Sequence, residues 1–325
     1  MKVGLVTNWD EHCAVAEYAR NLAKYCLIAR QDVEFKIITG NPIVAEHVLR
    51  ETKDVDVIHY NYCHHAFAHL DPQSWHRTGP VPRIMTLHES TDWYARRLIT
   101  TNVVDLIIMH DRIRDGAGMP NNVECIPFGV PDFEPKDLKV ERKVGTFGAA
   151  YPWKGLWPLA YACGSLHVPL MLMLSEPDTD RGKFMWDRLR QEITSVCPWA
   201  DIRIGGWFSD EEILTELAKC AVIAFPFDPA AQITGISSSV RYGLAARRPL
   251  VLTRMAHFSD LFDYEDDVYF VDGDLPAVLN LALFQVGTGT ERIPEQARKD
   301  MSWRVAAEKY TNVYNSIKIV EVVNA

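Results

Sequence analysis

The sequence predicts an α/β protein made of two Rossmann-like, doubly wound parallel-sheet domains that face a cleft. Three observations support this prediction. Short, almost continuously apolar runs recur along the chain, helix-like patterns separate them, and the alternation pauses once at a polar segment before it restarts. Such runs are too short for helices and apolar on both faces, as the strands of a buried parallel sheet must be.

Each apolar run predicts one strand, taken in chain order. The first half of the chain contains KVGLVTN, VEFKIIT, DVIHYNY, PRIMTLHE, DLIIMHD and VECIPFG. The second half contains VGTFGA, VPLMLML, ADIRIGG, AVIAFPF, PLVLT and DVYFVD. Helical patterns such as AVAEYARNLAKYCLIAR, residues 14–30, lie between these runs, so consecutive strands are expected to form strand–helix–strand units.

The polar segment is residues 130–143. It is charged, carries two prolines and has no hydrophobic period, so it predicts a linker. We therefore expect an N-terminal domain over residues 1–135 and a C-terminal domain over residues 143–300. The chain length of 325 residues suits two domains of roughly 150 residues each.

Composition narrows the class of protein. A formal net charge of −9 removes the broad basic surface that most nucleic-acid binders carry. Seven scattered cysteines, mostly within apolar segments, indicate reduced thiols of a cytoplasmic protein. The chain enters strand character at once and no apolar run reaches 18 residues, so we expect neither a secretory leader nor a transmembrane segment.

The first candidate ligand site lies in VGTFGAAYPWKGL, residues 144–156. Ligands of open parallel sheets bind outside the carboxyl ends of the strands, and here a lysine follows Gly148 by six residues and begins a helix. A cation at a helix N-terminus is unfavourable unless an anion lies between them, and phosphate is a common one. Lys154 is therefore a candidate phosphate ligand; a solvated surface lysine is the alternative.

Two further strand-to-helix loops carry candidate residues. In residues 225–253, Ser237 or Ser238 can cap a helix, Gly235 precedes them, and Arg241 lies four residues after Ser237 on the same helix face. The guanidinium could then reach back over the helix start, although serines at helix starts are usually only caps. The third loop exposes Trp207, which could stack on a base or pack at an interface.

A histidine-rich stretch, HYNYCHHAFAH, raises the question of a metal. Its potential ligands are His59, Cys63, His64, His65 and His69. Zinc is conceivable at this spacing, but polar and aromatic residues after a strand more often line an acceptor pocket. The interpretation adopted is that the protein has no metal site.

Several motifs, in order along almost the whole chain, resemble the retaining glycosyltransferases of the GT-B fold, in the broad family-4 group. They are TNWDEHCAVAEYARNLA, IMTLHE, VECIPFGVPD, GTFGAAYPWKGL, SSSVRYGLAARRPLVLT with FSDL, and SWRVAAEKYTNVYNSI. The fifth resembles the branch whose donor-site helix reads Ser-Ser-Gly-Ala-Val-Arg. Each motif alone is weak, but six in the family's order are a specific signal.

The resemblance implies transfer of a sugar from a nucleotide-sugar donor, with His88 and Lys154 as catalytic residues. Donor binding would involve Gly148, Lys154, Trp207, Thr234, Gly235, Ser237, Ser238 and Arg241, with Cys13 and Ala14 on a cleft loop. It also implies that residues 301–325 form a helix that crosses back to the N-terminal domain. Retention of configuration is expected, with no metal and no cofactor beyond the co-substrate.

The chain also departs from that family. Ala149 stands where many members have an arginine, and Thr234 and Tyr242, or positions one residue away, lie where they have two glutamates. A sugar-nucleotide epimerase or hydrolase of the same fold, and an inert nucleotide-sugar-binding protein, therefore stay open as alternatives. The donor base, the sugar and the acceptor are open too; the acceptor could be a small molecule, a glycan, a lipid-linked glycan or, less expected, nucleic acid.

Overall fold

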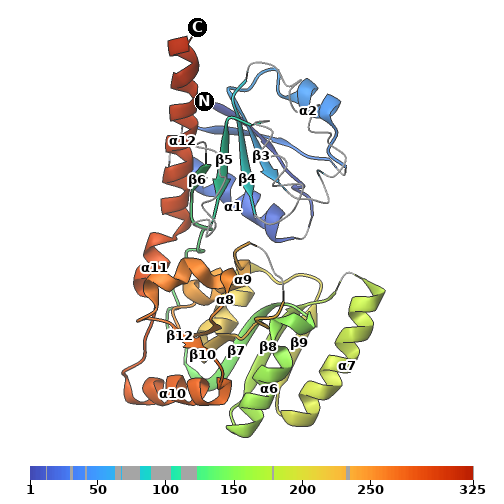
Figure 1. The fold of residues 1–325 in the computed structure, drawn as a ribbon, viewed down its shortest axis with the longest axis vertical. Helices are drawn as coiled ribbons and strands as arrows, with labels where there is room; N and C mark the ends of the chain where they lie inside the picture. Colours follow the sequence, from blue (N-terminus) through green and yellow to red (C-terminus); the bar gives the residue numbers. More distant parts are fainter. Residues whose placement is uncertain are drawn as a thin grey trace. The chain divides into compact units, whose positions relative to one another are not determined.

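The computed structural model describes residues 1–11, 13–29, 32–40, 42–62, 67, 81–88, 104–110, 123–177, 179–231 and 235–324, the last seven of them as backbone only. Its internal contacts divide the chain into two compact units. The first unit comprises Met1–Gly129, Thr234–Ile236 and Met301–Ala325, and the second comprises Val130–Ile233 and Ser237–Asp300. Figure 1 shows their elements, coloured along the sequence.

The first unit is built on a six-stranded parallel sheet in the order β2-β1-β3-β4-β5-β6. Its strands are β1 (Lys2–Val6), β2 (Glu34–Ile38), β3 (Val57–Tyr62), β4 (Arg83–Leu87), β5 (Leu106–Met109) and β6 (Val123–Cys125). Both faces of this sheet are buried: Val57 belongs to one apolar cluster and its neighbour Ile58 to the other. Two buried faces explain why the strands are continuously apolar.

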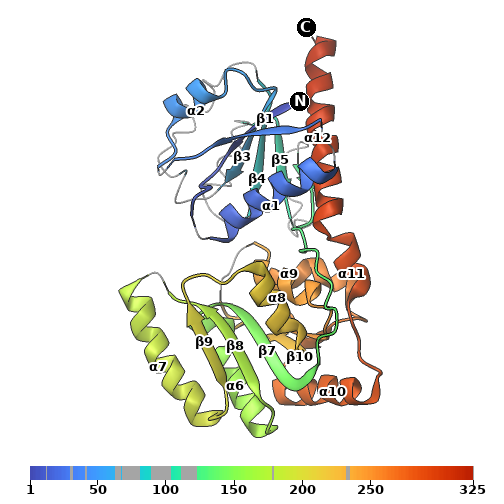
Figure 2. The same ribbon diagram turned by 180° about the vertical axis from the view of Figure 1, so that it is seen from behind.

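Two long helices cover one face of this sheet. They are α1 (Ala14–Ala29) and α12 (Trp303–Asn324), which lie side by side in Figures 1 and 2, while α2 (Ala45–Glu51) lies near the opposite edge. The buried positions Tyr18, Leu22, Tyr25 and Cys26 recur at helical spacing along α1. This stripe packs against Trp303 and Tyr310 of α12.

A buried chain of hydrogen bonds fastens α12 to the sheet. The Tyr310 hydroxyl lies 2.8 Å from that of Tyr18 and 2.7 Å from Thr86 Oγ1. His59 extends the chain, because its Nε2 lies 2.8 Å from Thr86 Oγ1 and its Nδ1 lies 2.7 Å from the Tyr314 hydroxyl. Burial lowers the pKa of His59 to about 3, so the ring is neutral and serves as a structural crosslink.

The second unit has a six-stranded parallel sheet in the order β12-β11-β10-β7-β8-β9. Its strands are β7 (Glu141–Ala149), β8 (Leu170–Ser175), β9 (Asp201–Gly205), β10 (Cys220–Phe225), β11 (Leu250–Thr253) and β12 (Tyr269–Val271). Strand β7 begins at Glu141, inside the segment predicted to be a linker. Glu141 pairs with Cys220 of β10, and this pairing has no apolar signature in the sequence.

Helices cover both faces of the second sheet. The α-helices are α6 (Leu156–Ser165), α7 (Asp180–Val196), α8 (Asp210–Ala218), α9 (Ser238–Ala245), α10 (Leu275–Thr288) and α11 (Glu295–Asp300), with 3-10 helices η1 (Pro152–Lys154) and η2 (Ala256–Tyr264). Helix α6 packs beside α7 and α10, whereas α9 packs beside α8 and α11. The α/β prediction of two doubly wound parallel sheets is confirmed.

Two global features can be stated for the described ranges. No helix within them is both long and apolar enough to cross a bilayer. Among the described cysteines, the thiols of Cys26, Cys163, Cys197 and Cys220 are unbridged and buried.

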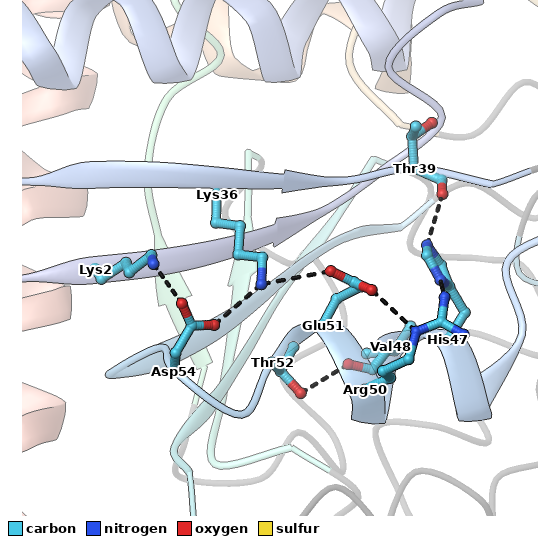
Figure 3. A network of polar contacts seen from close by, with 9 residues as sticks. All are labelled: Lys2, Lys36, Thr39, His47, Val48, Arg50, Glu51, Thr52 and Asp54. Carbon is cyan, nitrogen blue, oxygen red and sulfur yellow. Dashed lines mark hydrogen bonds and ion pairs between the residues drawn. The ribbon is translucent and has the colours of Figure 1, made fainter.

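A network of charged side chains connects the first two strands to α2 (Figure 3). Asp54 pairs with Lys2 of β1 and, at 3.0 Å, with Lys36 of β2. Lys36 also lies 3.4 Å from Glu51 at the end of α2, and Glu51 accepts a hydrogen bond from Arg50. The two lysines lower the pKa of Asp54 to about 2.

Asp54→Asn tests this network. The pKa of Asp54 is lowered in the folded state, so its stabilisation is complete above about pH 5 and is lost as the pH falls through about 2. Near neutral pH, the variant should unfold at a lower urea concentration than the wild type. At about pH 2 the two proteins should unfold at nearly the same urea concentration. Asp187→Asn, on an exposed position of α7, is the control. A difference that persists unchanged into acid would contradict the prediction.

Candidate functional site

Each sheet has one position where the chain reverses the direction in which strands are added. In the first unit it lies between β1 and β3, and in the second between β7 and β10. Loops that leave the carboxyl ends of such a strand pair diverge, and ligands of parallel α/β sheets bind there. The site is therefore sought at these two edges, one unit at a time.

At the second-unit switch point the structure brings together Gly148, Lys154 and Ser239. Gly148 lies near the end of β7 with φ 146°, a conformation that favours glycine. A Cβ at this position would lie 3.5 Å from Ser239 Oγ and 3.8 Å from Lys154 Cε. Two predicted donor-site residues are thus adjacent, and Ser239 joins them.

The position of Lys154 depends on a close backbone approach. Lys154 ends η1, and Gly155 follows it as the N-cap of α6, with φ 68°. A Cβ on Gly155 would lie 1.8 Å from the carbonyl oxygen of Pro226, so only glycine fits. The Asp228 N–H donates to the Trp153 carbonyl at 2.8 Å, which ties η1 to the segment after β10. Lys154 therefore directly precedes a helix start, as the sequence predicted.

Two aromatic rings hold the Lys154 ammonium. Its Nζ lies 4.4 Å from the ring centre of Trp153 and 4.0 Å from that of Phe227. Burial lowers the pKa of Lys154 to about 7. Among the side chains described, no carboxylate offsets this burial. The amine is therefore positioned so that a bound anion would favour its charged form.

The serines at the start of α9 differ from the capping expected. Ser237 is the N-cap residue by position, but within the described atoms its side chain makes no capping hydrogen bond. Its hydroxyl lies 3.1 Å from Ser239 Oγ instead, and Ser238 is the first helical residue. Ser237 is therefore the N-cap residue, one of the two predicted, but its hydroxyl bonds to Ser239 and not to a backbone N–H.

Arg241 has an ion-pair partner that the sequence did not predict. Its side chain is only 1% exposed and forms an ion pair with Asp260 of η2, which is itself mostly buried. The sequence suggested that the guanidinium reaches back over the start of α9. Asp260 lies nineteen residues later, and helical spacing within α9 could not reveal it. A role of Arg241 in donor binding remains a prediction.

The remaining donor-site candidates are divided between the two units, since Gly235 belongs to the first and Trp207 and Tyr242 belong to the second. Trp207 follows β9 and is 43% exposed. Gly235 has φ 81°, while Thr234 lies outside the described residues. Tyr242 donates a 2.6 Å hydrogen bond to Asp210 at the start of α8. It thus joins α9 to α8.

A cavity of about 460 Å³ lies beside the ends of β11 and β12, at the carboxyl edge of the second sheet. Its lining includes Gly155 and Phe227, which also surround the Lys154 position, together with Asp228, Arg254 and Asp272. Arg254 pairs with Asp272 at 3.3 Å and with Glu265 at 3.2 Å. The cation in this cavity therefore has carboxylate partners, unlike Lys154.

In the first unit, His88 follows β4 and is partly exposed. Its Nε2 lies 2.8 Å from Asn61 Oδ1 and its Nδ1 lies 3.2 Å from His110 Nε2. Tyr18 packs edge-on against the ring at 4.8 Å. Burial lowers the pKa of His88 well below its usual value, with the neighbouring His110 and His59 as smaller causes. Both ring nitrogens of the predicted catalytic histidine thus face protein groups.

The predicted loop residues Cys13 and Ala14 lie at the start of α1. The Asn8 amide donates to Cys13 Sγ at 3.1 Å and to Glu11 at 2.7 Å. Ala14 is the first residue of α1 and is exposed. Hydrogen bonds from Asn8 to Glu11 and Cys13 therefore hold the loop between β1 and α1.

The histidine-rich stretch can be judged only in part. His59 uses both nitrogens to crosslink Thr86 and Tyr314, so it is engaged in the packing of α12. Cys63, His64, His65 and His69 lie outside the described residues. Within the described ranges, no group of three potential ligands could hold a metal ion.

Sequence reasoning missed several residues of these two edges. Phe227, Asn61 and His110 were noticed only as parts of predicted strands, Trp153 as part of VGTFGAAYPWKGL and Asp260 as part of FSDL. His110 did carry a usable signal: like His88, it directly follows a predicted buried strand.

Comparison with known proteins gives no match at the level of sequence: no family model and no curated protein matches this chain. Solved structures do match. HepE of Anabaena in complex with UDP is 13% identical with a TM-score of 0.73, over 97% of this chain and 100% of HepE. A complex of HepE with UDP-glucose matches similarly, with a TM-score of 0.70.

Two further solved structures match over comparable lengths. A glycosyltransferase from Rickettsia africae is 14% identical with a TM-score of 0.72, over 97% of this chain and 98% of that one. AviGT4, a glycosyltransferase involved in avilamycin A biosynthesis, is 16% identical with a TM-score of 0.66, over 98% of both chains. These likenesses show the fold: two parallel α/β units of the GT-B type.

Arg241→Ala should lower the free energy of unfolding by about 3–5 kcal/mol, because it leaves the carboxylate of Asp260 buried without its cation. Arg241→Ala combined with Asp260→Ala should recover part of that loss. Arg254→Ala, which removes a more exposed ion-paired arginine, is the matched control and should cost less than about 1 kcal/mol. Urea unfolding measures all three, and equal losses for the two arginines would contradict the assignment.

Proposed function

We propose that this protein is a glycosyltransferase that uses a nucleotide-sugar donor. The observation that carries the proposal is Lys154: a largely enclosed ammonium, held by two aromatic rings, at the switch point of a parallel sheet. A diphosphate is the anion that such a position suits. The GT-B fold and the UDP and UDP-glucose complexes of HepE support the proposal, and make uridine donors the first to test.

The main requirement of the proposed chemistry is stabilisation of the leaving group. As the bond between the sugar and the diphosphate breaks, negative charge grows on the diphosphate, and a positioned cation stabilises that charge. Lys154 would supply it, assisted by the backbone N–H groups at the start of α9. We further propose that transfer is of the family-4 type, retains configuration, needs neither metal nor cofactor and takes place in the cytoplasm.

A donor panel tests the proposal. Purified protein is incubated with common nucleotide sugars, with and without EDTA, and the released nucleoside diphosphate is measured. One donor should be cleaved slowly without acceptor, and EDTA should not abolish the reaction. Lys154→Met should lower kcat/KM roughly ten- to a hundredfold.

Lys219→Met is the control for that substitution. It removes an equal charge at the opposite edge of the sheet, directly before β10, and should leave kcat/KM unchanged. Rapid isomerisation of the donor would instead indicate an epimerase. Tight binding of a nucleotide sugar without turnover would indicate the inert binding protein. Full activity of Lys154→Met would refute the assignment of Lys154.

The pH profile of kcat/KM gives a second, independent prediction. Because the pKa of Lys154 is lowered to about 7, the free enzyme loses this positive charge as the pH rises through that value. We therefore expect kcat/KM to fall over the same range. Lys154→Arg should show a lower kcat/KM without this decline, because arginine keeps its charge. The same decline in both proteins would show that another group titrates.

A further inference from the structure

A line of three polar side chains crosses adjacent strands at the carboxyl edge of the first sheet. Asn61 belongs to β3, His88 follows β4 and His110 follows β5. His88 Nε2 lies 2.8 Å from Asn61 Oδ1, His88 Nδ1 lies 3.2 Å from His110 Nε2, and His110 Nδ1 lies 3.0 Å from the Ile126 carbonyl oxygen. The two imidazoles therefore join two protein oxygens through three contacts.

Both ends of this line can only accept hydrogen bonds. The Ile126 end is a backbone carbonyl. At the other end, the Asn61 amide nitrogen lies 2.9 Å from the Val15 carbonyl and 3.0 Å from Thr7 Oγ1. The backbone carbonyl of Val15 requires a donor, which fixes the amide so that its oxygen faces His88.

A count of protons follows from these fixed ends. Three contacts need three protons, one for each oxygen and one between the rings. Two neutral imidazoles supply only two N–H groups. With two protons, either the facing nitrogens of the two rings both carry lone pairs, or one of the two oxygens receives no hydrogen bond. A third proton allows all three hydrogen bonds and gives the pair of rings one positive charge.

The titratable groups described around the pair neither supply nor cancel that charge. Those facing it from the packed elements are Tyr18 of α1, His59 of β3 and, next to Tyr18, Tyr310 of α12. Burial raises the pKa of both tyrosines and lowers that of His59, so all three are neutral. Burial opposes a charge on His88, whereas the unmade hydrogen bond favours it.

We propose that His110 is a positioning partner of His88, and that the two rings bind the third proton as one unit and carry the positive charge together. This inference rests on the proposed function for its catalytic meaning, since His88 is the predicted catalytic histidine. His110 then determines which nitrogen of His88 carries hydrogen, and whether His88 is charged.

Two substitutions of His110 separate this role from simple packing. In His110→Gln, the new amide can donate to the Ile126 carbonyl and present its oxygen to His88 Nδ1. Two oxygens would then flank His88 and favour its doubly protonated form. His110→Phe offers no acceptor, so His88 should stay neutral with hydrogen on Nε2.

The experiment is a ¹⁵N NMR titration of the full chain labelled at histidine, from about pH 8 to about pH 5. In the wild type, the His88 and His110 signals should shift together with a single midpoint and one proton taken up. Charged His88 should persist in His110→Gln and be lost in His110→Phe. If His110→Phe does not fold, the titration of His88 in the wild type and in His110→Gln still tests the proposal, and loss of the charged form of His88 in His110→Gln would contradict it.

Two results would overturn the proposal. One is a wild type in which His88 and His110 both stay neutral down to about pH 5. The other is an identical titration of His88 in the wild type and His110→Phe. The NMR measurement needs no substrate, so its failure is distinct from a failure of the proposed function, which the donor panel reports.

Discussion

The structure depends on the need to bury both faces of two parallel sheets. Helices must cover each face, and interior strand positions must be apolar, so polar side chains are driven to the strand ends. Polar side chains that remain inside the first unit bond to one another in the chain from Tyr18 through Tyr310 and Thr86 to His59. The loops at the carboxyl edges are consequently where chemistry can be placed.

Three cationic side chains of the second unit have different partners. Arg241 is buried and its charge is matched by Asp260, while Arg254 has two carboxylate partners. Lys154 is enclosed by Trp153 and Phe227, which attract a cation but do not neutralise it. The three cations therefore differ in their partners: two have carboxylates and Lys154 has two aromatic rings.

Three of the histidines in the first unit, His59, His88 and His110, differ in their surroundings. His59 is fully buried and crosslinks the sheet to α12. His88 and His110 lie at the strand ends, where their nitrogens form a line between two oxygens. A buried crosslink keeps a ring neutral, whereas a line that ends in two acceptors favours an added proton. Position relative to the strand end thus separates the buried crosslink from the line of polar contacts.

The sequence by itself determined the fold class, the twelve strand positions in outline and the loops that carry Lys154, Gly148 and His88, because apolar periodicity and glycine positions are local properties. It could not determine the partners of those residues. Asp260 for Arg241, Phe227 for Lys154 and His110 for His88 come from segments that only the tertiary fold brings together. Local spacing predicted the N-cap position of Ser237, but not that its hydroxyl bonds to Ser239 or that Arg241 pairs with Asp260. Burial lowers the pKa of Lys154 and of His88, and burial is a property of the folded chain alone.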